Sequence, residues 1–169
     1  MRKLRSVHVL WGLLFILFLV GCGDDHLTNG DQHISEEMHA FISDYIIQEN
    51  ASNHSSTEKQ FEVHKIYGTS EEDGVISVYV KSFSAGFNRA TGLQEQSGMV
   101  IPVLLRISEM DGTYTVTDYV ETIDGSYWES SLKEMFPKKY YRKVLRNSGA
   151  SDLQKQMDQK VKKWLEEEA

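Results

Sequence analysis

The segment GMVIPVLLRISEMDGTYTVTDYVE, residues 98–121, carries the pattern that decides the fold. Two runs rich in Val, Ile, Thr and aromatic residues, Met99 to Ile107 and Thr113 to Glu121, each have the composition of a β-strand. Between them lies Met110-Asp111-Gly112, and Asp-Gly is a typical sequence for the tight turn of a β-hairpin. We therefore expect these two strands to be antiparallel neighbours.

The same pattern occurs earlier in the chain. Strand-like runs at Gln60 to Tyr67 and Gly74 to Phe83 lie on either side of a second turn signal, Glu72-Asp73-Gly74. Two such hairpins predict a four-stranded antiparallel sheet. The polar segment between them, Ser84 to Gly98, contains three glycines, and we interpret it as a surface loop and as the best candidate for a recognition element.

Amphipathic helices are expected before and after the sheet. The first, from about Ser35 to Glu49, has an apolar face at helical spacing. That face comprises Ile34, Met38, Phe41, Ile42, Tyr45 and Ile46. After the sheet, Ser126-Tyr127-Trp128-Glu129 matches a capping box and predicts a short helix that ends before Pro137.

Two further helices are predicted at the C-terminal end. One runs through Tyr140 to Arg146, and Gly149 separates it from a final helix. The apolar stripe of that final helix comprises Leu153, Met157, Val161, Trp164 and Leu165. The order of elements predicts an α+β fold: an N-terminal helix, a four-stranded antiparallel sheet, and C-terminal helices, with the helices covering one face of the sheet.

The N-terminal residues have the features of a bacterial export signal. Basic residues open the chain, and the mostly apolar run from Val7 to Val20 is shorter than the ~20 residues that a membrane-spanning helix needs. Leu19-Val20-Gly21-Cys22 resembles the lipobox of bacterial lipoproteins, in which the cysteine thiol is diacylated and the preceding bond is cut. The resemblance implies cleavage between Gly21 and Cys22, a lipid anchor on Cys22, and a location on the extracytoplasmic face of the cell membrane.

These features predict three parts of the chain: a signal peptide over 1–21, a lipidated cysteine with a polar tether over 22–32, and a single α+β domain over 33–169. Cys22 is the only cysteine. An internal disulfide and a zinc site built from cysteines are therefore excluded.

Charge is distributed unevenly along the 169 residues. Residues 23–137 contain 6 basic and 20 acidic side chains, whereas residues 138–169 contain 9 basic and 5 acidic ones. Five of these cations fall on one side of the predicted helix near residue 140, with Tyr141, Val144 and Leu145 on the other. The five are Lys138, Lys139, Arg142, Lys143 and Arg146. This face either contacts anionic lipid head groups or an anionic wall polymer, or is a solvated surface that balances the acidic body. An acidic, exported chain is not expected to bind nucleic acid.

Histidines and carboxylates near the first helix are candidate metal ligands. His33 and Glu37 are four residues apart, and Glu36 and His39 are three apart, so a helix places each pair on one side. Two ligands do not make a site, and His54 and His64 lie in a predicted loop and strand with no sequence reason to converge. We expect no metal and no cofactor.

One family resemblance extends over roughly residues 60–146. The segments His64-Lys65-Ile66-Tyr67-Gly68-Thr69, Gly98 to Pro102, Asp124-Gly125-Ser126-Tyr127 and Met135-Phe136-Pro137 resemble a domain of uncharacterised Firmicutes lipoproteins. A similar segment occurs at the extracytoplasmic ends of some antibiotic-sensor-type membrane metallopeptidases. The resemblance implies a Gram-positive origin and a sensing or interaction role, and it brings no catalytic residue.

The sequence therefore favours a lipid-anchored extracytoplasmic binding or interaction domain, with an envelope protein as a candidate partner, rather than an enzyme. An alternative is a small-molecule carrier or accessory subunit with an aromatic-lined pocket. A third hypothesis, a hydrolase with a dispersed site, predicts His and carboxylate side chains clustered in a cleft with perturbed pKa values.

Overall fold

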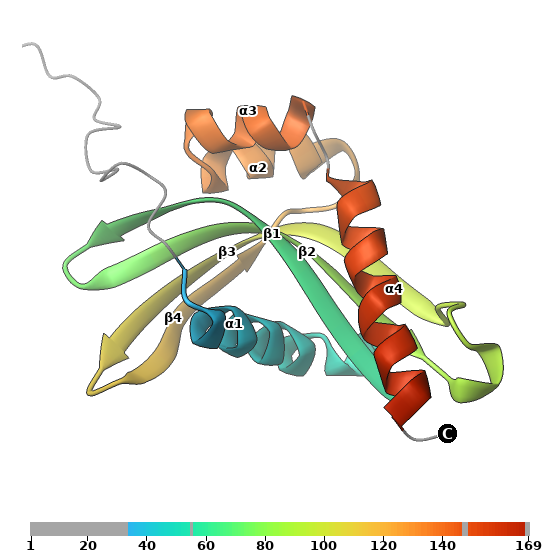
Figure 1. Ribbon diagram of the computed structural model, residues 1–169. Helices are drawn as coiled ribbons and strands as arrows, with labels where there is room; N and C mark the ends of the chain where they lie inside the picture. The colour runs from blue at the N-terminus through green and yellow to red at the C-terminus, as the bar shows by residue number, and fades with distance from the viewer. Residues whose placement is uncertain (1–33, 55, 147–148, 168–169) are drawn as a thin grey trace, which may run out of the picture.

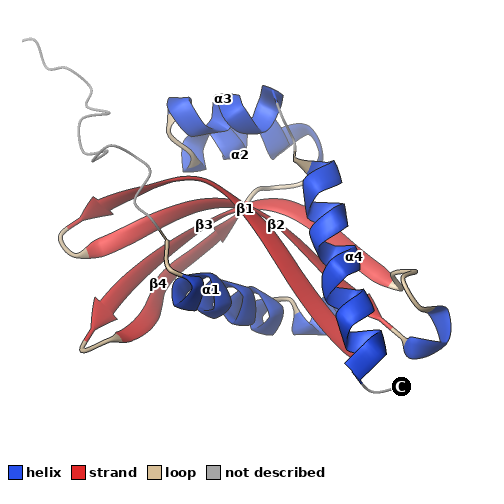
Figure 2. Cartoon of the chain, in the orientation of Figure 1, coloured by secondary structure: helices blue, strands red, loops and turns tan. Residues whose placement is uncertain are grey.

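The computed structural model describes residues 34–54, 56–146 and 149–167, and it has the predicted α+β architecture. The described residues do not include the predicted signal peptide (1–21) with Gly21, the predicted tether (22–32) with Cys22, or His33. Helix α1 (Glu36–Glu49) is followed by four strands and then by three helices. These elements form one sheet with helices on both of its faces (Figures 1 and 2).

The sheet is an antiparallel meander in the order β1-β2-β3-β4. Its strands are β1 (Lys59–Glu72), β2 (Val75–Phe87), β3 (Ser97–Met110) and β4 (Thr113–Glu121). Both predicted hairpins are confirmed. At the two turns, Asp73 and Asp111 have φ of 50° and 52°, and each is followed by a glycine with positive φ. This is the conformation of a two-residue hairpin turn, for which Asp-Gly is favoured.

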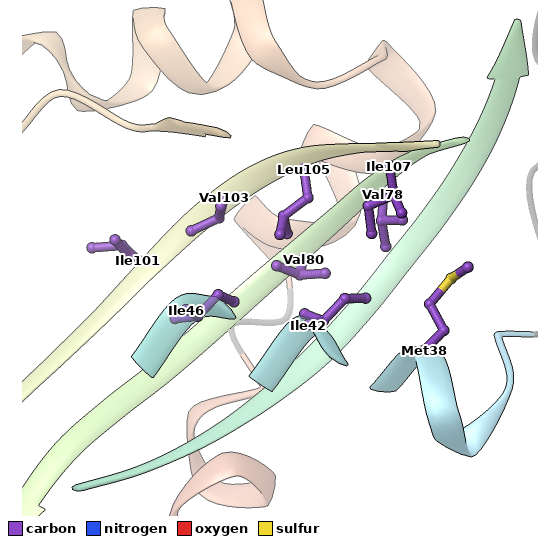
Figure 3. Packing of buried hydrophobic residues seen from close by; sticks show 9 residues of the cluster. All are labelled: Met38, Ile42, Ile46, Val78, Val80, Ile101, Val103, Leu105 and Ile107. Carbon is purple, nitrogen blue, oxygen red and sulfur yellow. The ribbon is translucent and has the colours of Figure 1, made fainter. Parts of the chain in front are cut away.

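Helix α1 covers one face of the sheet. Ser35 caps its N-terminus by accepting a hydrogen bond from the Met38 backbone N–H at 3.1 Å. Met38, Ile42 and Ile46 point from α1 onto side chains of the two central strands (Figure 3). Those strand residues are Val78, Val80, Ile101, Val103, Leu105 and Ile107. The predicted apolar side of the helix is thus its packed side.

The three C-terminal helices, α2 (Trp128–Met135), α3 (Lys138–Arg146) and α4 (Ala150–Glu167), lie on the opposite face. Because side chains alternate along a strand, Tyr79 and Phe83 of β2 point away from α1 and toward these helices. The predicted stripe of α4 packs on Val63, Phe83, Ala85 and Phe87. The expectation that the helices cover one face is confirmed for the C-terminal helices and is wrong for α1, which covers the other face because both faces of β2 and β3 are apolar.

Strand β1 has an irregularity where it passes α3. Its pairing with β2 shifts between Ile66 and Gly68, so that Tyr67 has no paired residue on β2. The ring of Tyr140 from α3 packs directly against Gly68 and is fully buried. Its hydroxyl donates to the carbonyl of Thr69 at 3.1 Å. This bulge and the glycine let α3 approach the backbone of β1 closely.

Several local expectations are corrected. Ser126 does not cap α2: it lies in a three-residue 3₁₀ turn, Gly125–Tyr127, and α2 begins at Trp128 with no side-chain cap. Strands β1, β2 and β3 also extend beyond the predicted runs, because their ladders continue into polar residues, whereas β4 has the predicted bounds. Among the described residues, no helix is long and apolar enough to cross a membrane.

Candidate functional site

The basic face predicted on α3 has a matching arrangement in the structure. The five cations Lys138, Lys139, Arg142, Lys143 and Arg146 are all exposed. At 3.6 residues per turn, their positions span an arc of about 140° on the helix. Tyr140 and Val144 on the other side are buried, so packing fixes which side of α3 faces solvent. Leu145, predicted to be on the packed side, is 45% exposed instead, because its position borders the basic arc.

Two cations of the basic face lie close to the ring of Tyr140, which is buried beneath that face. The Nζ atoms of Lys139 and Lys143 lie 5.2 and 5.5 Å from the centre of the Tyr140 ring. Lys143 also donates to the carbonyl of Tyr67 at 3.4 Å. A cation above an aromatic ring is attracted by the electron density of that ring. Tyr140 therefore couples the packing of α3 to the positions of its charges.

A hollow of about 460 Å³ lies beside this face and adds a cation that sequence reasoning missed. It is lined by Lys65, Ile66 and Tyr67 of β1 together with Lys143 and Arg146 of α3. Lys65 Nζ is 3.8 Å from Asp152 Oδ2 at the start of α4, which partly offsets its charge. The helical spacing of α3 does not indicate which lysines on other elements lie nearby. Lys65 therefore could not be grouped with the five cations of α3 from the sequence alone.

A second cluster, centred on Glu62 of β1, was not predicted. The Glu62 side chain is fully buried, and its carboxylate accepts hydrogen bonds from three groups. Ser43 of α1 and Ser82 of β2 each donate a hydroxyl at 2.7 Å, and His64 Nδ1 lies 3.0 Å from Oε2. Burial raises the pKa of the Glu62 carboxyl, but the hydrogen bond and charge of His64 and the two hydroxyls outweigh burial and hold the pKa below its usual value.

The cluster continues from the strand to α1. His64 Nε2 lies 2.8 Å from Nδ1 of His39, so two histidines that the sequence analysis did not expect to converge are in direct contact. The sequence patterns that bear on this contact between His39 and His64 are local and weak. Glu62 and His64 are two apart on one side of a strand, and His39 and Ser43 are four apart on one side of a helix. Neither pattern states that the two sides meet.

A groove of about 490 Å³ borders this cluster at the free edge of β1, between α1 and α4. Its lining comprises Glu36, His39, Ala40, Ser43 and Asp44 of α1, Val63 and His64 of β1, and Gln156 and Lys160 of α4. Lys160 Nζ donates to the carbonyl of Glu62 at 2.7 Å. The hydroxyl of Ser43 is committed to Glu62. The arrangement is therefore suited to holding a proton rather than to presenting a nucleophile.

The hydrolase hypothesis predicts histidine and carboxylate side chains clustered in a cleft. His39 and His64 line the groove, whereas Glu62 contacts His64 from the buried side and does not line it, so this hypothesis stays a prediction. His54 is separate: it is buried, and its ring nitrogens contact the hydroxyls of Ser97 at 2.7 Å and Ser84 at 3.2 Å. Burial lowers the pKa of His54. Among the described residues, no group of three or more His, Cys, Asp or Glu side chains has an arrangement that could hold a metal ion.

A carrier pocket would need aromatic side chains that line a cavity, but those of β2 are packed in the core. Tyr79 contacts Phe136 and Tyr140, with ring centres 5.2 Å apart in both pairs. Phe83 and Phe87 are buried under α4. Aromatic side chains in such clusters contribute to stability through packing.

The segment Ser84 to Gly98, predicted as a recognition loop, is shorter as a loop than expected. Residues 84–87 belong to β2 and 97–98 to β3, because the two strands pair as far as Gly86 and Ser97. The remaining loop is held to the domain: the Arg89 guanidinium lies 4.5 Å from the ring centre of Trp164 on α4. Its role in recognition stays a prediction.

Comparison with known proteins adds no relative from which to transfer a function: no protein-family model, curated protein or solved structure matches the chain. The features that can indicate a function are therefore the basic face of α3, the hollow beside it, and the Glu62 cluster.

Proposed function

We propose that this protein is a lipid-anchored extracytoplasmic binding domain that contacts the phosphate groups of an anionic membrane surface through α3. The observation that supports this most directly is the exposed arc of five cations, which are held over a buried apolar side. Each cation close to an anionic membrane contributes about 1 kcal/mol to binding. The hollow that contains Lys65 would accept a single phosphate group beside the helix.

The proposed anchor makes this contact geometrically reasonable. Cys22 and Ile34, the first described residue, are 12 positions apart. Even fully extended, a segment of this length spans only about 40 Å. A domain held this close to a bilayer samples its surface continuously, so weak attraction by α3 suffices to set its orientation. The acidic body of the domain would then face away from the membrane.

The leucine at the border of the basic arc supports a lipid surface as the partner. Leu145 is 45% exposed and lies with Arg142 and Arg146 at a second, smaller hollow. An exposed apolar side chain beside cations is typical of helices that lie at the membrane interface. A soluble wall polymer offers phosphate groups without an apolar layer, so it gives Leu145 no partner.

Binding to anionic vesicles tests this proposal. We expect residues 23–169, without lipid, to bind vesicles that contain phosphatidylglycerol at low salt, and to lose binding as salt screens the charges. Replacing Lys139 and Arg142 with glutamine should weaken vesicle binding by roughly 30-fold, from about 1 kcal/mol for each cation. Co-sedimentation or flotation of the vesicles measures this directly.

The matched control changes the same charge elsewhere. Lys155 and Lys162 of α4 are exposed cations, and replacing both with glutamine should leave vesicle binding nearly unchanged. Equal losses in the two double variants would show that binding follows net charge and not the face of α3. Binding to an anionic wall polymer but not to vesicles would contradict a lipid surface as the partner.

The anchor has a separate test. Cys22→Ala should abolish incorporation of labelled palmitate and leave the precursor at its uncleaved size, because the thiol is the proposed site of diacylation. Gly23→Ala, one position further along, should be processed and lipidated normally. Unchanged lipid labelling of Cys22→Ala would refute the lipoprotein assignment, and metabolic labelling with gel mobility measures both outcomes.

A further inference from the structure

The Glu62 cluster lies where α1 is joined to the edge strand of the sheet. Two adjacent polar contacts make this junction, His39 with His64 and Ser43 with Glu62. Neither contact is part of the basic face of α3 or of the proposed lipid anchor. Burying a carboxylate is costly unless it is fully hydrogen-bonded, so a cluster of this kind is an unusual way to attach a helix to a sheet.

The geometry of the two histidines restricts how many protons they hold. The rings are inclined by only 16°, their centres are 5.0 Å apart, and Nδ1 of His39 is 2.8 Å from Nε2 of His64. Most of the distance between the centres is therefore the gap between the two nitrogens, and the rings meet edge to edge. One hydrogen fits between two nitrogens at this distance.

The neighbouring carboxylate fixes the tautomer of His64. Glu62 is an acceptor when ionised, so Nδ1 of His64 carries a hydrogen that it donates to Oε2. In neutral His64, Nε2 then has no hydrogen and accepts from Nδ1 of His39. The chain Glu62, His64, His39 is thus connected by two hydrogen bonds that both point toward the carboxylate.

Protonation of this chain has two steps with opposite effects. A first proton on the imidazole pair makes the shared hydrogen bond charge-assisted, and Glu62 balances the charge. A second proton would place an N–H group on each side of the gap of 2.8 Å, so the hydrogen bond could not form. Among the described residues, the other charged groups that line the groove are Glu36 and Asp44 of α1 and Lys160 of α4.

We propose that Glu62, His64 and His39 form a proton-binding site in which one proton strengthens the link between α1 and β1 and a second proton breaks it. The effect would be local, because Ile42 and Ile46 bury the C-terminal half of α1 in the core whatever the state of the histidines. The part that loosens is the start of α1, residues 36–41, which contains His39 and precedes Ile42. If the proposed anchor is correct, this part directly follows the tether and would respond to pH outside the cell.

The test uses the full chain in detergent micelles, with ¹⁵N-labelled histidine, between about pH 8 and about pH 5, the range in which histidines titrate. Ring-nitrogen NMR counts the protons on His39 and His64. As the pH falls, we expect the pair of histidines first to gain one proton that the two rings share, and then to gain a second near the acid end of the range. With the second proton, amide exchange over residues 36–41 should rise about tenfold beyond its intrinsic pH dependence, the factor for one lost hydrogen bond.

Two comparisons make the result decisive. In His39→Gln, the acid-dependent step in amide exchange should disappear, since one nitrogen of the pair is absent. His54, which is buried but has only hydroxyl partners, is an internal control that should show no linked change in α1. The proposal would be overturned if the two histidines titrate independently of each other. It would also be overturned if the pair gains only one proton over the whole pH range, or if the exchange step persists in His39→Gln. None of these readouts depends on vesicle binding or on lipidation.

Discussion

Gly68→Ala is expected to lower the free energy of unfolding by about 3 kcal/mol, the upper part of the range for overpacking a core. A Cβ atom at Gly68 would lie 2.0 Å from Cε1 and Cζ of Tyr140. The Tyr140 ring has little room to withdraw, because it is fully buried against Tyr79 and its hydroxyl is bonded to Thr69. Either the bulge in β1 or the position of α3 must change.

Chemical denaturation of the variant measures this loss, and two further variants identify its cause. Gly98→Ala on β3 is the matched control: its Cβ would meet only the flexible side chain of Glu95, at 3.0 Å, so we expect a small effect. Combining Gly68→Ala with Tyr140→Leu removes the clashing ring. The double variant should therefore lose less stability than the two single variants together. Strict additivity would show that the contact between Gly68 and Tyr140 does not limit the packing of α3.

Glu62→Gln is the second change with a large expected effect, a loss of about 3 kcal/mol at neutral pH, because charge-assisted hydrogen bonds are removed from a buried site. The amide nitrogen of glutamine cannot accept a hydrogen bond. One of the three donors around the carboxylate, the hydroxyls of Ser43 and Ser82 and the imidazole of His64, is then left without its acceptor.

The loss of stability caused by Glu62→Gln should depend on pH, and the direction of the pKa shift of Glu62 determines how. The pKa of Glu62 is lower in the folded protein than in the unfolded chain, so its contribution is fully present above the unfolded value of about 4.3. That contribution is lost as the pH falls through the folded pKa. The stability difference between the natural chain and Glu62→Gln should therefore shrink in acid. Glu72→Gln, an exposed glutamate on the same strand, should cost little at any pH. A difference that is constant with pH would contradict an ionised Glu62.

The hairpins could be predicted from sequence because their information is local. Asp73-Gly74 and Asp111-Gly112 specify a tight turn whatever surrounds them, and the flanking residues favour extended backbone. The ends of the strands could not be predicted in the same way. Ser84 in β2 has a polar side chain typical of a loop, yet it pairs because Met99 lies opposite. Pairing is a property of two strands, whereas composition describes only one.

The candidate sites differ in the same respect. The basic face of α3 was predictable because helical spacing alone places its cations on one side. Lys65 and the Glu62 cluster were not, because their partners belong to elements far apart in the chain. His39 and His64 are separated by 25 positions, and Lys143 and Tyr67 by 76. A single sequence states which side of each element is polar but not which polar sides meet.

The simple order of the sheet also has a kinetic consequence. Each strand pairs with its predecessor, so the sheet closes through short loops, whereas Lys160 of α4 meets Glu62 across 98 positions. Contacts between distant residues form at a greater entropic cost and later than local ones. The unfolded chain would thus form its hairpins first and dock α4 last. Until that docking, Val63, Phe83 and Phe87 remain uncovered, and this interval is when proteases and chaperones have their best access to the protein.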